Sequence, residues 1–175
     1  MLILPKQLEL SRFFVRHLCD DDVNERYLYW LRDTAAKEYI EYAKEKRQIE
    51  ELITYVQEKN DSETAIFMGI FTLQNNIHIG NIKYEPIDLD NNIAEMGILV
   101  GDNNWRGKGV APEVIKGTGN WLSKNLGIET ITLGVSKENT NALRAYEKIG
   151  FKVAEIITTE QNKSAFRMEI STENL

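Results

Sequence analysis

The chain has 175 residues, of which 42% are hydrophobic and 27% charged, enough for one sizeable core but too few for two comfortable domains. The formal net charge is −6 and the isoelectric point is near 5.1, which argues against a nucleic-acid binder, because such a protein needs a basic face. No apolar run of about 20 residues exists, so we expect no membrane span. The short apolar start is interrupted by Pro5 and Lys6, so we expect no signal peptide. We therefore expect one cytoplasmic domain over residues 1–175.

The N-terminal third is predicted to form one strand and two helices. Residues 8–16 are typical of a strand. Residues 19–33 begin with an acidic cluster that suits a helix N-terminus, and their apolar side chains recur at helical spacing. The same spacing returns in residues 46–59. The order strand, helix, helix is what we expect for this part.

The middle of the chain changes to strand periodicity. Residues 65–73 and 77–84 are predicted to pair as a hairpin around a polar turn. Residues 93–100, IAEMGILV, form the next predicted strand after a second polar turn at residues 88–92. Gly97 within this strand indicates either a bulge or a small residue beneath a bulky neighbour.

The C-terminal part alternates between helices and strands. A helix from about Pro112 to Asn125 and a strand over residues 129–135 predict a parallel strand pair with a right-handed crossover. Gly117 and Gly119 indicate close packing of that helix on the sheet. The remaining predicted elements are a helix after Asn139 that ends near Gly150, and strands over residues 152–158 and 164–170.

Three residues that often carry chemistry are interpreted as structural here. Cys19 is the only cysteine, so it can form neither an internal disulfide nor a two-cysteine metal site. No motif connects His17 or His78 to Cys19, and we expect no metal.

The stretch WRGKGVAPE, residues 105–113, places glycines and cations between a strand and a helix. Free amides and the dipole at a helix N-terminus attract anions, and glycines let a phosphate approach the backbone. The patterns of a P-loop and of a Rossmann fingerprint are both absent. The stretch therefore indicates either an anion site or an ordinary basic loop.

Two motifs in matched order resemble the GNAT superfamily of N-acetyltransferases. Residues 106–111, RGKGVA, fit the family motif Q/R-x-x-G-x-G/A. ENTNALRAYEKIGF resembles the signature N-x-x-A-x-x-x-Y-x-x-x-G-F, which is carried here by Asn139, Ala142, Tyr146, Gly150 and Phe151. Residues 8–33 are similar to the branch that acts on ribosomal-protein N-termini and nucleotide-sugar amines.

The resemblance implies an α/β fold with a mixed, predominantly antiparallel sheet of six to seven strands. It also implies a splayed parallel central pair and helices on both faces. Acetyl-CoA is the implied co-substrate, and dimers are common in the family, so a homodimer is a candidate assembly. The residues implied to bind acetyl-CoA are Ile98, Leu99, Val100, Arg106, Gly107, Lys108, Gly109, Val110, Ala111, Asn139, Ala142 and Tyr146.

The resemblance assigns proton transfer to two residues. Tyr146 matches the general acid that protonates the leaving thiolate, although its helical spacing alone also fits a core tyrosine. Glu95 matches the glutamate that some members use as a base; the alternative is a substrate-orienting or structural carboxylate.

The implied function is transfer of an acetyl group from acetyl-CoA to a primary amine by direct attack. The amine belongs to a small molecule, an amino-sugar nucleotide or a protein N-terminus. The alternative is a non-catalytic acyl-CoA sensor or scaffold. The acceptor pocket is expected at the two N-terminal helices, residues 85–90 and the last hairpin. Acidic side chains in the N-terminal region that could favour a cation are Asp20, Asp21, Asp22, Glu38 and Glu41.

Overall fold

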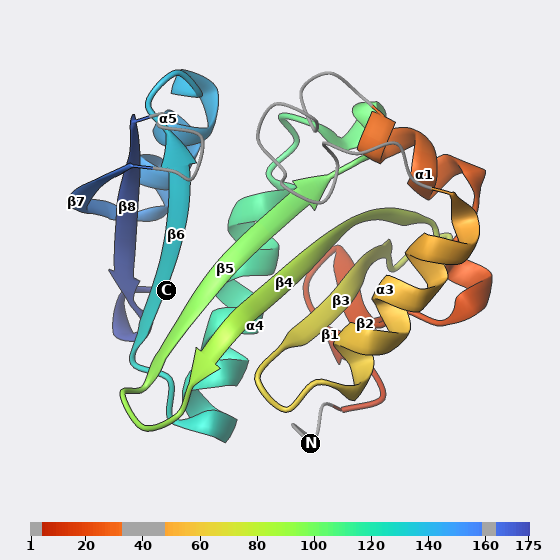
Figure 1. Cartoon of the computed structure of the whole chain (residues 1–175), viewed down its shortest axis with the longest axis horizontal. Helices are drawn as coiled ribbons and strands as arrows, with labels where there is room; N and C mark the ends of the chain where they lie inside the picture. Colours follow the sequence, from red (N-terminus) through yellow and green to blue (C-terminus); the bar gives the residue numbers. More distant parts are fainter. Residues whose placement is uncertain (1–4, 33–47, 159–163) are drawn as a thin grey trace. The chain divides into compact units, whose positions relative to one another are not determined.

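A computed structural model describes residues 5–32, 48–158 and 164–175 (Figure 1). The chain forms two compact units, residues 1–85 with 97–114, and residues 86–96 with 115–175. Their boundaries fall inside strand β4 (His78–Asp88), strand β5 (Ile93–Val100) and helix α4 (Val110–Leu126). The prediction of one domain over the whole chain stays a prediction.

Eight strands form one mixed sheet in the order β1-β2-β3-β4-β5-β6-β8-β7. The expected mixed α/β fold, mostly antiparallel with a parallel pair, is confirmed, but the strand number of six to seven was too low. The difference arises at the N-terminus, where the predicted single strand over residues 8–16 is two antiparallel strands, β1 (Leu8–Glu9) and β2 (Phe13–His17). The Leu10 N–H donates to the Phe13 carbonyl oxygen over 2.9 Å and closes the turn that contains Arg12.

In the first unit, α1 (Glu25–Arg32) and α3 (Ile49–Asp61) lie side by side and cover one face of the strands (Figure 1). The predicted helix over residues 19–33 begins later, because the acidic run Asp20–Asp22 forms a separate 3-10 turn. The Asn24 side chain caps α1 by accepting hydrogen bonds from the backbone N–H groups of Arg26 and Tyr27.

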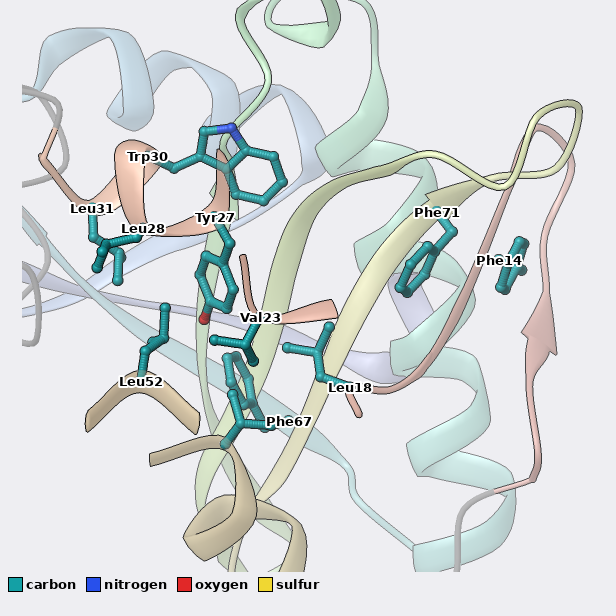
Figure 2. Packing of buried hydrophobic residues seen from close by; sticks show 11 residues of the cluster. Phe14, Leu18, Val23, Tyr27, Leu28, Trp30, Leu31, Leu52, Phe67 and Phe71 are labelled. Atoms are coloured by element: carbon teal, nitrogen blue, oxygen red, sulfur yellow. The ribbon is translucent and has the colours of Figure 1, made fainter. Parts of the chain in front are cut away.

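The core of the first unit is rich in aromatic side chains (Figure 2). Leu52 and Val56, four residues apart on α3, point inward together with Phe67 of β3 (Ile66–Thr72). Strand β3 is buried along its whole length, which explains its continuous apolar sequence. The predicted hairpin of β3 and β4 is confirmed, with Ile66 opposite Tyr84 in antiparallel register.

The second unit contains the parallel pair that was expected around α4. The pairing of β5 with β6 (Thr130–Ser136) runs from Ile93 opposite Thr130 to Glu95 opposite Thr132. Antiparallel strands β7 (Lys152–Thr158) and β8 (Ser164–Ser171) follow helix α5 (Thr140–Ile149). A Cβ atom on Gly119 would overlap Leu175 and lie 3.0 Å from Ile131, so this glycine packs closely on β6, as predicted. The predicted splay of the parallel pair stays a prediction.

His78 is buried in the first unit among aromatic rings, and its ring stacks on Phe71 with centroids 4.9 Å apart. Its Nε2 atom lies 2.8 Å from Asn81 Oδ1 and 3.0 Å from the Gly80 carbonyl oxygen, so Nε2 carries the hydrogen. Nδ1 is buried and has no hydrogen-bond partner in the described part of the chain. Burial lowers the pKa of His78 below its ordinary value of 6.5.

This burial predicts a loss of stability in mild acid. Because the folded state binds the His78 proton less readily than the unfolded state, stability is full above pH 6.5 and falls as the pH drops below it. The loss reaches at most about 1.4 kcal/mol per pH unit. Thermal unfolding at pH 7.5 and 5.5 should show a smaller decrease in Tm for His78→Gln than for the wild type. His17→Gln is the matched control; if it flattens the dependence equally, His78 is not the cause.

Among the helices within the described ranges, none is long and apolar enough to cross a membrane.

Candidate functional site

The segment between β5 and α4 is a turn with two left-handed glycines. Gly107 has φ +71° and Gly109 has φ +74°, values that side chains with a Cβ atom rarely adopt. We call residues 106–109 the glycine turn. Helix α4 begins directly after it at Val110, two residues earlier than predicted, so the free amides of the first helical turn start at the turn itself.

Arg12, in the turn between β1 and β2, forms hydrogen bonds with the backbone of the glycine turn. Its Nη1 donates to the Lys108 carbonyl oxygen over 3.0 Å, and its Nη2 donates to the Gly109 carbonyl oxygen over 3.1 Å. The carboxylate of Glu113, in the first turn of α4, accepts from Arg12 Nε over 2.7 Å and from the Arg12 backbone N–H over 2.6 Å. We call this arrangement the Arg12–Glu113 clamp. Sequence reasoning missed both residues, because no local spacing connects positions about 100 residues apart.

The two cations of the glycine turn have different surroundings. Arg106 Nε donates to the Val100 carbonyl oxygen over 3.0 Å, so its guanidinium group lies at the end of β5. Lys108 Nζ lies 5.8 Å from the centre of the Trp105 ring, which itself packs edge-on against Phe13. The Lys108 backbone N–H approaches the Trp105 carbonyl oxygen at 3.4 Å, so this residue offers an anion its ammonium group rather than its amide.

The end of β5 approaches β4 closely. A Cβ atom on Gly80 would overlap the Leu99 carbonyl oxygen, so that oxygen lies against β4. Neighbouring residues of a strand direct their backbone groups to opposite edges, so those of Ile98 and Val100 are directed away from β4. Gly97 is exposed, and a Cβ atom there would meet no described atom within 4 Å; a bulky neighbour therefore does not explain this glycine.

Glu95 lies in the part of β5 that belongs to the second unit. Ala94 and Met96, its neighbours in the strand, are buried, while Glu95 is half-buried. Alternation along β5 thus places the carboxylate on the more open face, as the sequence predicted.

Helix α5 begins and ends as predicted. Asn139 is its N-cap, with Oδ1 accepting from the Ala142 N–H over 3.2 Å, and Gly150 ends it in the left-handed conformation at φ +117°. Tyr146 is half-buried, and its ring packs edge-on against Phe151 with centroids 5.7 Å apart. Burial raises the pKa of Tyr146 above its ordinary value of 10.

The alternative of a core position for Tyr146 is weakened by the packing of its helix. Leu143, Tyr146 and Ile149 lie at core-like helical spacing and lead to the buried Phe151, but none of residues 140–149 is itself buried. A half-buried phenol on a helix that has no buried residue is suited to donate its hydroxyl hydrogen to a ligand.

The acidic residues near α1 serve the fold. Asp22 forms an ion pair with Arg16 at 2.7 Å, and Asp20 accepts two hydrogen bonds from Gln57. Cys19 is exposed and its thiol donates to Asp22 over 3.1 Å. Glu38 and Glu41 lie outside the described residues.

Glu85 begins the segment that was expected in the acceptor pocket. Its carboxylate forms ion pairs with Lys59 Nζ at 2.6 Å and with Lys83 Nζ at 2.8 Å. Although partial burial opposes it, these bonds hold the pKa of Glu85 below its ordinary value. No cluster of three or more His, Cys, Asp or Glu in the described ranges could hold a metal ion.

Comparisons with known proteins agree on one family. A family model described as "Acetyltransferase (GNAT) domain" matches residues 12–152. The chain is 22% identical over 142 residues to an N-acetyltransferase 9-like protein of Caenorhabditis briggsae, covering 73% of this chain and 69% of that protein.

Solved structures with the same fold include two acetyltransferases in complex with CoA. RimL, a ribosomal L7/L12 alpha-N-protein acetyltransferase, has a TM-score of 0.84 at 13% identity and covers 94% of this chain and 97% of its own. Spermidine N-acetyltransferase from Vibrio cholerae, in complex with CoA and spermine, has a TM-score of 0.80 at 20% identity. The match covers 94% of this chain and 98% of that chain. With the family match extending over most of the sequence, the chain belongs to the GNAT acetyltransferase family.

Proposed function

We propose that this protein is an acetyl-CoA-dependent N-acetyltransferase that acetylates a primary amine by direct attack in a ternary complex. The observation that carries the proposal is the glycine turn, in which Gly107 and Gly109 have positive φ and lead directly into the N-terminus of α4. Such a turn exposes backbone amides to a phosphate without an intervening Cβ atom. The family match, together with solved structures of the same fold that contain CoA, supports CoA as the phosphate ligand.

The donor is bound by backbone amides and by two cations. The N–H groups of Gly109, Val110 and Ala111 are proposed to hold the pyrophosphate, with Arg106 and Lys108 supplying positive charge.

The pantetheine arm is proposed to pair with β5 and with the start of α5. Ile98 and Val100 are the residues of β5 whose backbone groups are directed away from β4; the Val100 carbonyl oxygen already accepts from Arg106, so Val100 offers the arm its N–H group. Leu99 then contributes through its side chain, which packs on the core of the first unit. Asn139 uses Oδ1 for its own helix, so only its side-chain N–H₂ group can reach the arm near Ala142.

The chemistry requires a neutral amine and a protonated leaving group. The amine nitrogen forms a bond to the acetyl carbon as the carbon–sulfur bond breaks, and the products are an acetamide and CoA. Glu95 is proposed to accept the proton that the amine loses, directly or through water. Tyr146 is proposed to donate its proton to the sulfur, because its raised pKa keeps the phenol protonated at neutral pH.

The acceptor is a primary amine of a small molecule, an amino-sugar nucleotide or a protein N-terminus. The acidic cluster near α1 gives little support to a polycation in particular, because Asp20 and Asp22 already have partners within the fold.

Release of free thiol from acetyl-CoA tests the proposal. The full chain is incubated with acetyl-CoA and separate panels of polyamines, N-terminal peptides and amino-sugar nucleotides. We expect thiol release with one panel and none without acceptor. Binding of CoA in calorimetry without turnover on any panel would indicate the sensor or scaffold instead, and absence of CoA binding would contradict both functions.

A further inference from the structure

Arg12 contacts two consecutive peptide groups of the glycine turn at the same time. The two Nη atoms of one planar guanidinium group bind the Lys108 and Gly109 carbonyl oxygens, while Nε binds the Glu113 carboxylate. All four residues belong to the same compact unit. A point charge such as a lysine ammonium cannot replace this fork of donors.

The geometry of the peptide bond determines what this contact does to the amides. In a planar trans peptide, the carbonyl group and the following N–H group point in opposite directions. Because Arg12 holds the Lys108 and Gly109 carbonyls, the N–H groups of Gly109 and Val110 are turned away from Arg12. These two amides belong to the proposed pyrophosphate site, so the clamp directs them outward before any ligand arrives.

The glycine turn needs such a restraint. Glycine explores positive and negative φ almost equally, so a turn with two glycines can rotate its peptide planes at little cost. Binding a pyrophosphate to a mobile turn would cost the entropy of ordering it. A turn that is already held by Arg12 avoids part of that cost.

The clamp orients the turn and adds little net charge. Glu113 would repel a phosphate at the start of α4, but both of its oxygens are directed to Arg12 at 2.6 and 2.7 Å. Its side chain is only 18% exposed, whereas that of Arg12 is 48% exposed. The two charges neutralise each other, so a contribution of Arg12 to ligand binding is expected to arise from geometry.

We propose that Arg12, held by Glu113, is a positioning residue that preorganises the amides of Gly109 and Val110 for the pyrophosphate of CoA. The inference rests on the proposed function, because it concerns how the same acetyl-CoA is bound. It assigns a role to the turn between β1 and β2, which lies outside both sequence motifs.

Calorimetric titration with two ligands tests this role. CoA carries the pyrophosphate and pantetheine lacks it. We expect Arg12→Gln and Arg12→Lys each to weaken CoA binding about tenfold, the cost of one charge-assisted hydrogen bond. Pantetheine affinity should change less than about twofold for both variants, because pantetheine does not contact these amides. For Arg12→Lys, which keeps the positive charge beside Glu113, the loss should be nearly the same at low and high salt, since geometry rather than net charge is removed.

Two further variants separate geometry from charge and from folding. Lys116→Gln removes an exposed cation one turn further along α4 and should leave CoA affinity within about twofold. Glu113→Asp keeps the carboxylate charge but shortens its reach, so it should weaken CoA binding in the same direction as the Arg12 variants. It serves as the second test if an Arg12 variant does not fold.

The outcomes distinguish this inference from the proposed function. If the wild-type protein does not bind CoA, the proposed function fails. If the wild type binds CoA and Arg12→Gln binds it equally well, the positioning role fails alone. Full recovery of affinity in Arg12→Lys would show that only charge matters, and equal losses for CoA and pantetheine would indicate general damage; both results overturn the inference.

Discussion

Replacing Tyr146 by phenylalanine should lower kcat by about 10²- to 10³-fold while leaving the affinity for acetyl-CoA within about threefold of the wild type. The substitution removes one hydroxyl group and keeps the ring that packs edge-on against Phe151. The lost group is the proposed proton donor to the leaving thiolate, so the effect should fall on the chemical step. Steady-state kinetics with an identified acceptor and calorimetric titration with CoA measure the two quantities.

Tyr29→Phe is the matched control, because Tyr29 is 66% exposed on α1 and has no proposed role. It should leave kcat unchanged. An unchanged kcat in Tyr146→Phe as well would show that Tyr146 is a packing residue and that the thiolate leaves without this acid.

The same assignment predicts the pH dependence of the reaction. An acid must be protonated to act, and burial raises the pKa of Tyr146 above 10. Loss of the phenol proton therefore cannot reduce kcat below about pH 10. An alkaline decrease in kcat between pH 8 and 9 that disappears in Tyr146→Phe would contradict the raised pKa.

The second large effect is expected at Gly109. Alanine at φ +74° costs about 1–2 kcal/mol of backbone strain, and its Cβ atom would lie 3.3 Å from Arg12 Nη2. To relieve this crowding, either the glycine turn or the Arg12 side chain must move. Both determine the direction of the Gly109 and Val110 N–H groups, so either movement should weaken their contact with the pyrophosphate. We expect Gly109→Ala to weaken acetyl-CoA binding by about 10- to 100-fold, the equivalent of one charge-assisted hydrogen bond.

Gly127→Ala separates strain from ligand binding. Gly127 follows the other end of α4 with φ +71°, and a Cβ atom there would meet no described atom within 4 Å. Both variants should show a similar decrease in Tm in thermal unfolding, but Gly127→Ala should bind CoA like the wild type. If both lose CoA affinity equally, the loss at Gly109 reflects general destabilisation and not the geometry of the turn.

Predictions from the sequence succeeded where short-range forces decide the structure. Asn139 and Gly150 bound α5 as expected, because a helix cap depends on residues within one turn of it. The period-2 pattern of residues 93–100 gave both the limits of β5 and the more open face for Glu95. The two GNAT motifs likewise sufficed to identify the family, which the family match confirms.

Predictions failed where a distant partner decides the structure. The pattern of residues 8–16 is compatible with one continuous strand, but Arg12 donates its backbone N–H to Glu113 of α4 at the point where the chain turns. Helix α1 begins late because the acidic run Asp20–Asp22 is engaged by Arg16 and Gln57 rather than by a helix dipole.

The sequence by itself determined the family and the local form of the residues proposed to bind the donor, because motifs and caps are encoded by neighbouring residues. Only the tertiary structure brought Arg12 to the glycine turn. A contact between residues so far apart in the chain leaves no periodic or spacing signal, and it forms only when the folded strands and α4 place an arginine fork beside two carbonyl groups. The direction of the Gly109 and Val110 amides is therefore a property of the fold and not of the motif.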